Sequence, residues 1–158
     1  MKTQWQTARQ GYGGIILKVL VINGPNLNML GIRQPEIYGQ NSYQQLEQFI
    51  CNEAAALGME VRIFQSNHEG SIIDEVQAAY GREDAIIINP GGYTHTSVAL
   101  ADAVAAVALP TVEVHLTDPD SREDFRRVSY IRPYCLATFK GAGFDGYRQA
   151  LQLLAELK

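Results

Sequence analysis

The chain has 158 residues, which suits one domain, and a chain of this length can fold without disulfide or metal staples. Hydrophobic residues make up 46% and charged residues 19%, which excludes the disordered and fibrous classes. The net charge of −4 lacks the basic character of a nucleic-acid-binding protein, and no apolar run approaches the ~18 residues of a membrane span. Cys51 and Cys135 show no metal-binding spacing, so we expect two buried free thiols in a reducing cytoplasm.

The first 17 residues differ in character from the rest. They are polar, contain three glycines between positions 11 and 14, and lack the apolar core of a signal peptide. We therefore expect a flexible extension at residues 1–17 and a single catalytic domain at residues 18–158.

Short apolar runs then alternate with amphipathic segments along the chain. Strands are predicted at residues 18–22, 59–64, 84–88, 111–115 and 135–139. Helices are predicted from Ser42 to Leu57, opened by a capping-box pattern, and from Ser71 to before Gly81, opened by Ser71-x-x-Asp74. Three more are predicted at residues 96–108, 121–126 and 145–157. This α/β alternation predicts a doubly wound five-stranded parallel sheet in the flavodoxin-like order 2-1-3-4-5.

Polar side chains gather where three of these strands end. The first strand runs into Asn23 and Asn26, the third into Asn89, and the fourth ends with Glu113 and His115. In the predicted order these strands lie at or beside the switch point, beyond whose carboxyl ends ligands bind. The sequence therefore predicts a ligand site at this edge.

A glycine pair follows the third strand. Gly91 and Gly92 allow backbone amides to approach a ligand closely, and the helix that follows favours an anion at its start. An ordinary strand-to-helix turn would have the same glycines. His95, beside the helix start, favours a site.

Glu113 and His115 are two residues apart on a strand and so project from the same face of the sheet. A carboxylate beside an imidazole orients the ring and favours its protonated form, as a general acid requires. A purely structural ion pair is the alternative. A metal site is weakly supported, because the H-x-E and H-E-x-x-H patterns are missing.

The segment from residue 23 to residue 41 has no regular period and contains several glycines and prolines, which is typical of a lid or binding loop. It carries Arg33 and Tyr38. A nearby guanidinium favours tyrosinate, which would make Tyr38 a usable base, although a tyrosine in a loop is more often a packing residue.

Four long motifs carry a family resemblance. They are I-N-G-P-N-L-N-M-L-G-I-R-Q-P-E-I-Y-G (22–39), F-Q-S-N-H-E-G (64–70), N-P-G-G-Y-T-H-T-S-V-A-L-A-D-A (89–103) and V-E-V-H (112–115), followed by R-E-D-F-R-R-V-S-Y (122–130). In this order they closely resemble type II 3-dehydroquinate dehydratases, from about Lys18 to the end of the chain.

The resemblance implies a cofactor-free lyase that eliminates water from 3-dehydroquinate, through an enolate, to give 3-dehydroshikimate. Tyr38 matches the base that removes the C2 proton, and Arg33 the residue that lowers its pKa. Asn26 matches the residue that holds a water against the enolate. His115, supported by Glu113, matches the acid that protonates the departing C1 hydroxyl.

The resemblance also implies substrate contacts by Asn89, His95 and Arg126, and a carboxylate cradle made by the backbone amides of Leu116 and Thr117. Asp102 matches a position that reaches the substrate region from a neighbouring subunit, in an assembly of twelve chains built as a tetramer of trimers. A lysine imine is poorly supported, because none of the four lysines lies in the motif loops.

Three positions depart from the family pattern. Thr117-Asp118-Pro119-Asp120 stands where the family usually has Ser-Asn; Thr117 keeps an amide and a hydroxyl for the carboxylate, but two acids nearby would weaken its binding. Ile32 stands in the lid where Thr or Arg is commoner. Lys140 stands in the fifth strand where the family tends to be apolar, and the sequence offers no reason for it.

Two other classes share the predicted fold. A receiver-like signalling module would use Thr117 and Lys140, but it needs acidic residues where this chain has Asn23 and Asn89. A flavin- or nucleotide-binding module would depend on the Gly91-Gly92 turn. Within the dehydratase interpretation, the sequence does not distinguish the shikimate pathway of aromatic amino acid biosynthesis from quinate catabolism.

Overall fold

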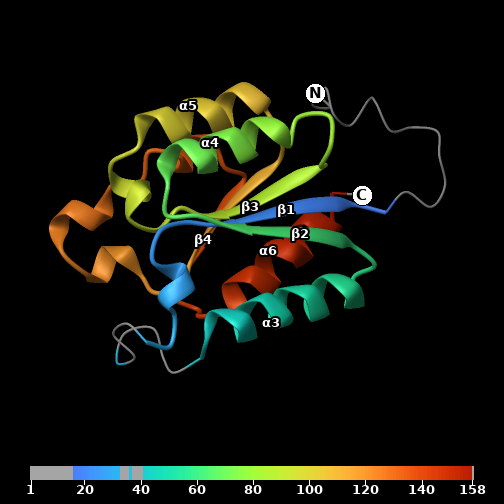
Figure 1. Ribbon diagram of the computed structural model, residues 1–158, viewed down its shortest axis with the longest axis horizontal. Coiled ribbons are helices and arrows are strands. Elements are labelled where there is room, and N and C mark those ends of the chain that lie inside the picture. The colour runs from blue at the N-terminus through green and yellow to red at the C-terminus, as the bar shows by residue number, and fades with distance from the viewer. Residues whose placement is uncertain (1–15, 33–35, 37–40, 158) are drawn as a thin grey trace.

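The structure is a computed structural model that describes residues 16–32, 36 and 41–157 (Figure 1). Most of the predicted extension at 1–17 and both lid residues singled out above, Arg33 and Tyr38, lie outside the described residues.

Five parallel strands form one sheet in the order β2-β1-β3-β4-β5, which confirms the predicted flavodoxin-like order. The strands are β1 (Lys18–Asn23), β2 (Glu60–Gln65), β3 (Ala85–Asn89), β4 (Thr111–His115) and β5 (Ala137–Lys140). In register, Asn23 of β1 lies opposite Asn89 of β3, so both asparagines reach the carboxyl edge of the sheet together.

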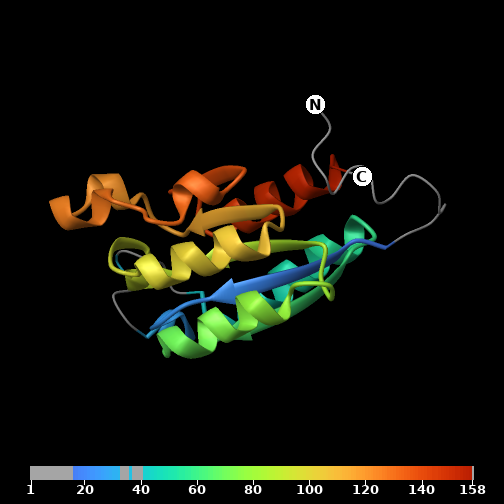
Figure 2. The same cartoon turned by 90° about the horizontal axis from the view of Figure 1, so that it is seen from above.

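Helices cover both faces of the sheet (Figures 1 and 2). The helices α3 (Tyr43–Ala56) and α6 (Asp145–Ala155) lie on one face, and α4 (Glu69–Ala78) and α5 (Val98–Val107) lie on the other. Because successive strand residues point to opposite faces, Val19 and Val21 pack into the core on the α3 side, whereas Leu20 and Ile22 pack into the core on the α4 side. None of the described helices is long and apolar enough to cross a membrane.

The predicted helix starts had different outcomes. At Ser42 the capping box is confirmed, since the Ser42 side chain accepts from the Gln45 backbone and the Gln45 side chain accepts from the Ser42 backbone. The helix start predicted at Ser71 is wrong, because α4 begins two residues earlier, at Glu69, and Ser71 lies inside the helix. The acidic Glu69 in the first turn favours this earlier start through the helix dipole.

The segment after β4 is built from 3-10 turns. The helix predicted at 121–126 is replaced by η3 (Pro119–Ser121) and η4 (Asp124–Arg127), and η5 (Arg132–Tyr134) follows. The η5 turn delays the last strand, so Cys135 lies before β5 rather than in it. Burial raises the pKa of the Cys135 thiol to about 12, and the charge of Glu113 adds to this effect, so the thiol stays protonated.

The expectation of two buried thiols is wrong, because Cys51 lies on the exposed face of α3 and Cys135 is only half-buried. Buried positions of that helix are Leu46, Ile50 and Ala54, and Cys51 falls outside this stripe.

Candidate functional site

Two glycines bring the loops after β1 and β3 into contact. The Gly24 backbone N–H donates to the Asn89 carbonyl at 2.8 Å, and a Cβ at Gly24 would lie 2.4 Å from the Pro90 carbonyl oxygen. Gly91 has a φ of +59°, and a Cβ there would lie 3.0 Å from the Pro25 carbonyl oxygen. Only glycine fits either position, so these residues set the floor of the site by letting backbones touch.

The loop that carries Asn26 is held in place by the loop that follows β2. Asn26 has a φ of 70°, a left-handed conformation that asparagine tolerates, and its backbone N–H donates to Asn67 Oδ1 at 3.0 Å. The Tyr93 hydroxyl donates to the Asn67 carbonyl at 2.8 Å. The second motif thus supports the site indirectly, by holding the loop of Asn26 against the loop after β3.

A buried polar chain fixes Asn89. Its Nδ2 donates to the Tyr147 hydroxyl at 3.3 Å, and its Oδ1 accepts from the Gly91 backbone at 3.2 Å. The Tyr147 hydroxyl in turn donates to Asn23 Oδ1 at 2.6 Å. Burial raises the pKa of Tyr147, which keeps this hydroxyl protonated as a donor. Sequence reasoning missed Tyr147, whose signal is a polar tip within the apolar stripe of α6.

Glu113 and His115 form the predicted pair. His115 Nε2 lies 2.7 Å from Glu113 Oε1, and both residues are buried. Because a carboxylate can only accept here, Nε2 carries a hydrogen and Nδ1 is the ring nitrogen that remains for a ligand.

Glu113 has further donors that sequence reasoning missed. Ser129 donates to Oε1 at 2.7 Å and Thr138 donates to Oε2 at 2.9 Å, and Arg132 Nε lies 3.4 Å from Oε2. Burial opposes the charged form, but the hydrogen bonds from His115, Ser129 and Thr138 outweigh it and lower the pKa of Glu113 to about 2. Glu113 is therefore a fixed negative charge behind His115.

His95 is oriented from the other side of the site. Its Nδ1 lies 2.6 Å from the Val128 carbonyl, which only accepts, so Nδ1 carries the hydrogen. Burial lowers the pKa of His95, and the nearby charges of His115 and Arg126 add to this effect. At neutral pH the ring is therefore neutral, and Nε2 can accept a hydrogen bond from a hydroxyl group.

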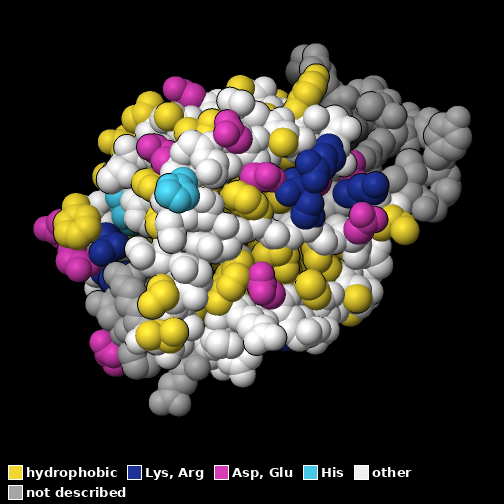
Figure 3. Space-filling model, viewed as in Figure 1, with side chains coloured by type: hydrophobic (Ala, Val, Ile, Leu, Met, Phe, Trp, Pro, Cys, Tyr) yellow, Lys and Arg dark blue, Asp and Glu magenta, His cyan; other side chains and the backbone are white. Residues whose placement is uncertain are grey.

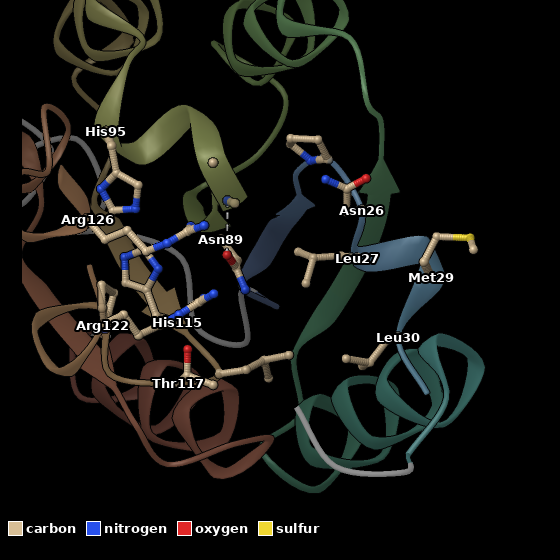
Figure 4. A pocket seen from close by; sticks show the side chains of 15 residues that line it. Asn26, Leu27, Met29, Leu30, Asn89, His95, His115, Thr117, Arg122 and Arg126 are labelled. Atoms are coloured by element: carbon tan, nitrogen blue, oxygen red, sulfur yellow. Dashed lines mark hydrogen bonds between the residues drawn. The ribbon is translucent and has the colours of Figure 1, made fainter. Parts of the chain in front are cut away.

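These side chains surround a cavity of about 160 Å³ beyond the carboxyl ends of β1, β3 and β4 (Figure 4). Its lining residues are Pro25, Asn26, Leu27, Met29, Leu30, Asn89, Gly91, Gly92, His95, His115, Leu116, Thr117, Pro119, Arg122 and Arg126. Among the residues that the structure describes, no carboxylate lines it, whereas two arginines do. Such a lining suits a small anion.

The predicted site residues fall into three groups. The cavity brings together those at or after the ends of three strands, β1, β3 and β4: Asn26, Asn89, Gly91, Gly92, His95, His115, Leu116, Thr117 and Arg126. Glu113 lies behind His115, and Asp102 is exposed on α5 and does not line the cavity. Arg33 and Tyr38 lie outside the described residues. Arg122 is an additional lining residue; its signal in the sequence was a second arginine in the same motif as Arg126.

No group of three His, Cys, Asp or Glu residues that could hold a metal ion occurs within the described ranges 16–32, 36 and 41–157. The arrangement can hold an anion between arginines and backbone amides, and it can deliver a proton from a histidine backed by a carboxylate. These are the elements of an acid-assisted elimination from an anionic substrate.

Comparison with known proteins agrees with this chemistry. The family model described as dehydroquinase class II matches residues 17–155. The chain is 52% identical over 141 residues to the 3-dehydroquinate dehydratase of Corynebacterium glutamicum strain R, covering 89% of this chain and 97% of that protein. It is 50% identical to catabolic 3-dehydroquinase 1 of Fusarium vanettenii, covering 84% of this chain and 92% of the relative.

A solved structure shares the architecture. The type II dehydroquinase of Butyrivibrio crossotus superposes with a TM-score of 0.86 at 46% identity, covering 88% of this chain and 97% of the other.

Proposed function

We propose that the chain, which belongs to the dehydroquinase class II family, eliminates water from 3-dehydroquinate to give 3-dehydroshikimate. The observation that carries the proposal is the Glu113–His115 pair at the wall of a cavity lined by Arg122 and Arg126. A proton donor backed by a buried carboxylate and a pair of guanidinium groups suit the loss of hydroxide from a carboxylate substrate.

The reaction begins with removal of the C2 proton, beside the ketone. Tyr38 takes this proton as tyrosinate, which the charge of Arg33 favours. The negative charge that develops on the ketone oxygen is stabilised through a water held by Asn26. The position of Asn26 in the cavity lining and the fixed backbone of its loop support this role.

The reaction ends with protonation of the C1 hydroxyl as it departs. His115 supplies this proton, and Glu113 orients the ring through the 2.7 Å contact to Nε2. The charge that Glu113 keeps, because its pKa lies at about 2, stabilises the imidazolium before the transfer.

The remaining residues hold the substrate. The backbone amides of Leu116 and Thr117 cradle its carboxylate, with Arg126 as a further contact. His95 Nε2 accepts from a ring hydroxyl, consistent with a hydrogen on Nδ1. Asn89, fixed by Tyr147, contacts the ring, and Gly91 and Gly92 allow the backbone to approach it.

We propose that the protein works as a dodecamer, a tetramer of trimers in which Asp102 reaches the site of a neighbouring subunit. The exposed face of α5 around Asp102 is apolar, since Val98 is 55% exposed and Ala105 and Ala106 are exposed as well. Light scattering should show a particle of about twelve chains, and an active monomer at assay concentration would contradict this assembly.

A cytoplasmic location is part of the proposal, because an exposed free thiol such as Cys51 persists in a reducing compartment. Most of the extension expected at residues 1–17 is proposed to lie outside the catalytic domain, since the family match begins at residue 17, whose carbonyl accepts from the Glu60 backbone N–H at 3.0 Å.

The test of the function is a direct assay. Purified protein is treated exhaustively with EDTA, mixed with 3-dehydroquinate, and followed through the absorbance of the enone product. We expect full activity without added metal. No enone product from folded protein would contradict the function, and activity that returns only with added metal would contradict its independence from cofactors.

A further inference from the structure

Two of the three departures from the family pattern meet in space. Lys140 ends β5 and pairs in register with His115, the last residue of β4. Its Nζ lies 3.2 Å from Asp118 Oδ1 and also contacts Asp120 Oδ2. The lysine that the sequence left unexplained is therefore the partner of the two acids that were expected to weaken substrate binding.

These acids belong to the loop that carries the proposed carboxylate cradle. Leu116, Thr117 and Pro119 line the cavity, and Asp118 and Asp120 alternate with them. Asp118 Oδ1 also accepts from the Asp120 backbone N–H at 3.0 Å, which caps the η3 turn. A displacement of either carboxylate would therefore move the neighbouring backbone.

The same loop is fastened by the chain that follows Lys140. The Gly143 backbone N–H donates to the Leu116 carbonyl at 2.9 Å, and the Gly141 N–H donates to the His115 carbonyl at 3.3 Å. A Cβ at Gly141 would lie 3.4 Å from Asp118 Cβ. Lys140 thus links the loop, through charge, to a segment that already fixes its backbone.

The charge balance gives Lys140 a second effect. With the ammonium present, the three groups carry a formal charge of −1; without it they carry −2, next to a cradle for an anion. The hydrogen bond from Lys140 lowers the pKa of Asp120, and the same bond raises the pKa of Lys140. All three groups are partly exposed, so the electrostatic effect is a modest one.

We infer that Lys140 is a positioning residue for substrate binding, which offsets one of the two negative charges of Asp118 and Asp120 and holds their loop so that the amides of Leu116 and Thr117 can receive the substrate carboxylate. The inference rests on the proposed function, in which this loop binds that carboxylate. It also accounts for how the chain keeps two acids beside an anion site.

Steady-state kinetics with 3-dehydroquinate tests the inference. Lys140→Met should raise KM about 3- to 10-fold and leave kcat within about 2-fold, and added salt should narrow the difference in KM. Lys140→Arg should restore KM, because it keeps the charge. Removing one acid as well, in Lys140→Met with Asp120→Asn, should restore most of the wild-type KM.

The matched control is Arg82→Met, which removes the same unit charge at the opposite end of the sheet from a side chain that is 55% exposed. Its KM should not change. A merely structural role for Lys140 predicts a lower melting temperature with an unchanged KM, and this result would overturn the inference.

Asp120→Asn alone keeps the test decisive if Lys140→Met does not fold. It should leave KM equal to or below that of the wild type, and a raised KM would overturn the inference. A folded wild-type protein without dehydratase activity would defeat the proposed function and this inference with it, whereas an active wild type with an unchanged Lys140→Met defeats the inference alone.

Discussion

The two ends of the sheet both gather arginines, but they use them differently. At the end where the strands begin, Arg62 donates from Nε to Glu83 at 2.8 Å and from Nη1 to Glu75 at 2.6 Å. The hollow there is lined by Glu60 and Glu83 as well as by cations. Figure 3 shows the basic side chains of this end lying beside acidic ones. At the opposite end, the described lining of the cavity includes Arg122 and Arg126 and no acid.

The difference shows that a cluster of arginines is not in itself a binding site. Arg62 donates from Nε and Nη1 to two carboxylates, those of Glu83 and Glu75, which offset its charge. Its role is therefore to hold β2 to the residues around α4. At the cavity, Arg122 and Arg126 share one acid, Glu123, whose Oε2 lies 3.7 Å and 2.7 Å from their Nε atoms; its side chain is 53% exposed and does not line the cavity. Glu113 lies behind His115 and already accepts from His115, Ser129 and Thr138. Two guanidinium groups against this one acid, Glu123, leave a net positive charge beside the cavity for a substrate anion.

The largest effect on turnover is expected from changes to Tyr38, the proposed base, and to Arg33, its proposed partner. Tyr38→Phe should be nearly inactive yet still bind 3-dehydroquinate, because it removes the only base proposed for the C2 proton. Arg33→Lys should lose at least about 10²-fold in turnover, since lysine keeps the charge but not the planar fork. Arg33→Ala should be worse still. Kinetics across pH, with binding followed by calorimetry, would check all three, and a fully active Tyr38→Phe would end the tyrosinate mechanism.

Removing an arginine from the cavity should affect binding before chemistry. Arg126→Ala should raise KM about 10- to 100-fold, the worth of a charged hydrogen bond, with a smaller effect on kcat. Arg127→Ala is the matched control, because Arg127 pairs with Asp124 and does not line the cavity. Equal increases in KM in the two variants would show that Arg126 does not contact the substrate.

Glu113 should also contribute to stability in a pH-dependent way. Its folded pKa of about 2 lies below the ordinary value of 4.5, so the stability it contributes is fully present above about pH 4.5 and is lost as the pH falls toward 2. Glu113→Gln should therefore be less stable than the wild type by up to about 3 kcal/mol at pH 6. Urea unfolding at pH 6 and pH 3 measures this gap, and a gap that widens in acid would contradict the assignment.

The smallest kinetic effect is expected at the amino end of the sheet. Arg62→Met should lower the free energy of unfolding by about 1–3 kcal/mol, because it leaves the largely buried Glu83 without its main partner, and kcat and KM should not change. Arg82→Met, on the more exposed partner of Glu83, should cost less than about 1 kcal/mol. A changed KM in folded Arg62→Met would contradict the claim that arginines at the amino end of the sheet contribute to stability and not to substrate binding.

Much of this arrangement could be predicted from residues that act locally. The alternation of apolar runs with amphipathic segments predicted the strand order, and the polar residues after β1, β3 and β4 predicted the edge that carries the cavity. Both depend on periodicities of a few residues and on a general rule for parallel sheets. The capping box at Ser42 is equally local, and it was confirmed.

What could not be predicted depends on contacts between distant segments. Tyr147 lies 124 residues from Asn23, and Ser129 and Thr138 meet Glu113 only because the chain after β4 folds back over it. Lys140 looked like an anomaly until β5 placed it beside Asp118 and Asp120. The predicted start of α4 was wrong because it depended on a local pattern at Ser71, whereas the packing of the whole helix sets where it begins.

In the proposed reaction, proton delivery by His115, at the carboxyl end of the sheet, drives loss of the hydroxyl. The most direct test is the turnover of 3-dehydroquinate by His115→Ala, measured beside the amino-end variant Arg62→Met. If His115 is the general acid, His115→Ala should lose about 10²–10⁴-fold in kcat with substrate binding nearly intact, while Arg62→Met should turn over at the wild-type rate. Near wild-type turnover by folded His115→Ala would contradict this role for His115, which would then be structural, and the acid would lie elsewhere.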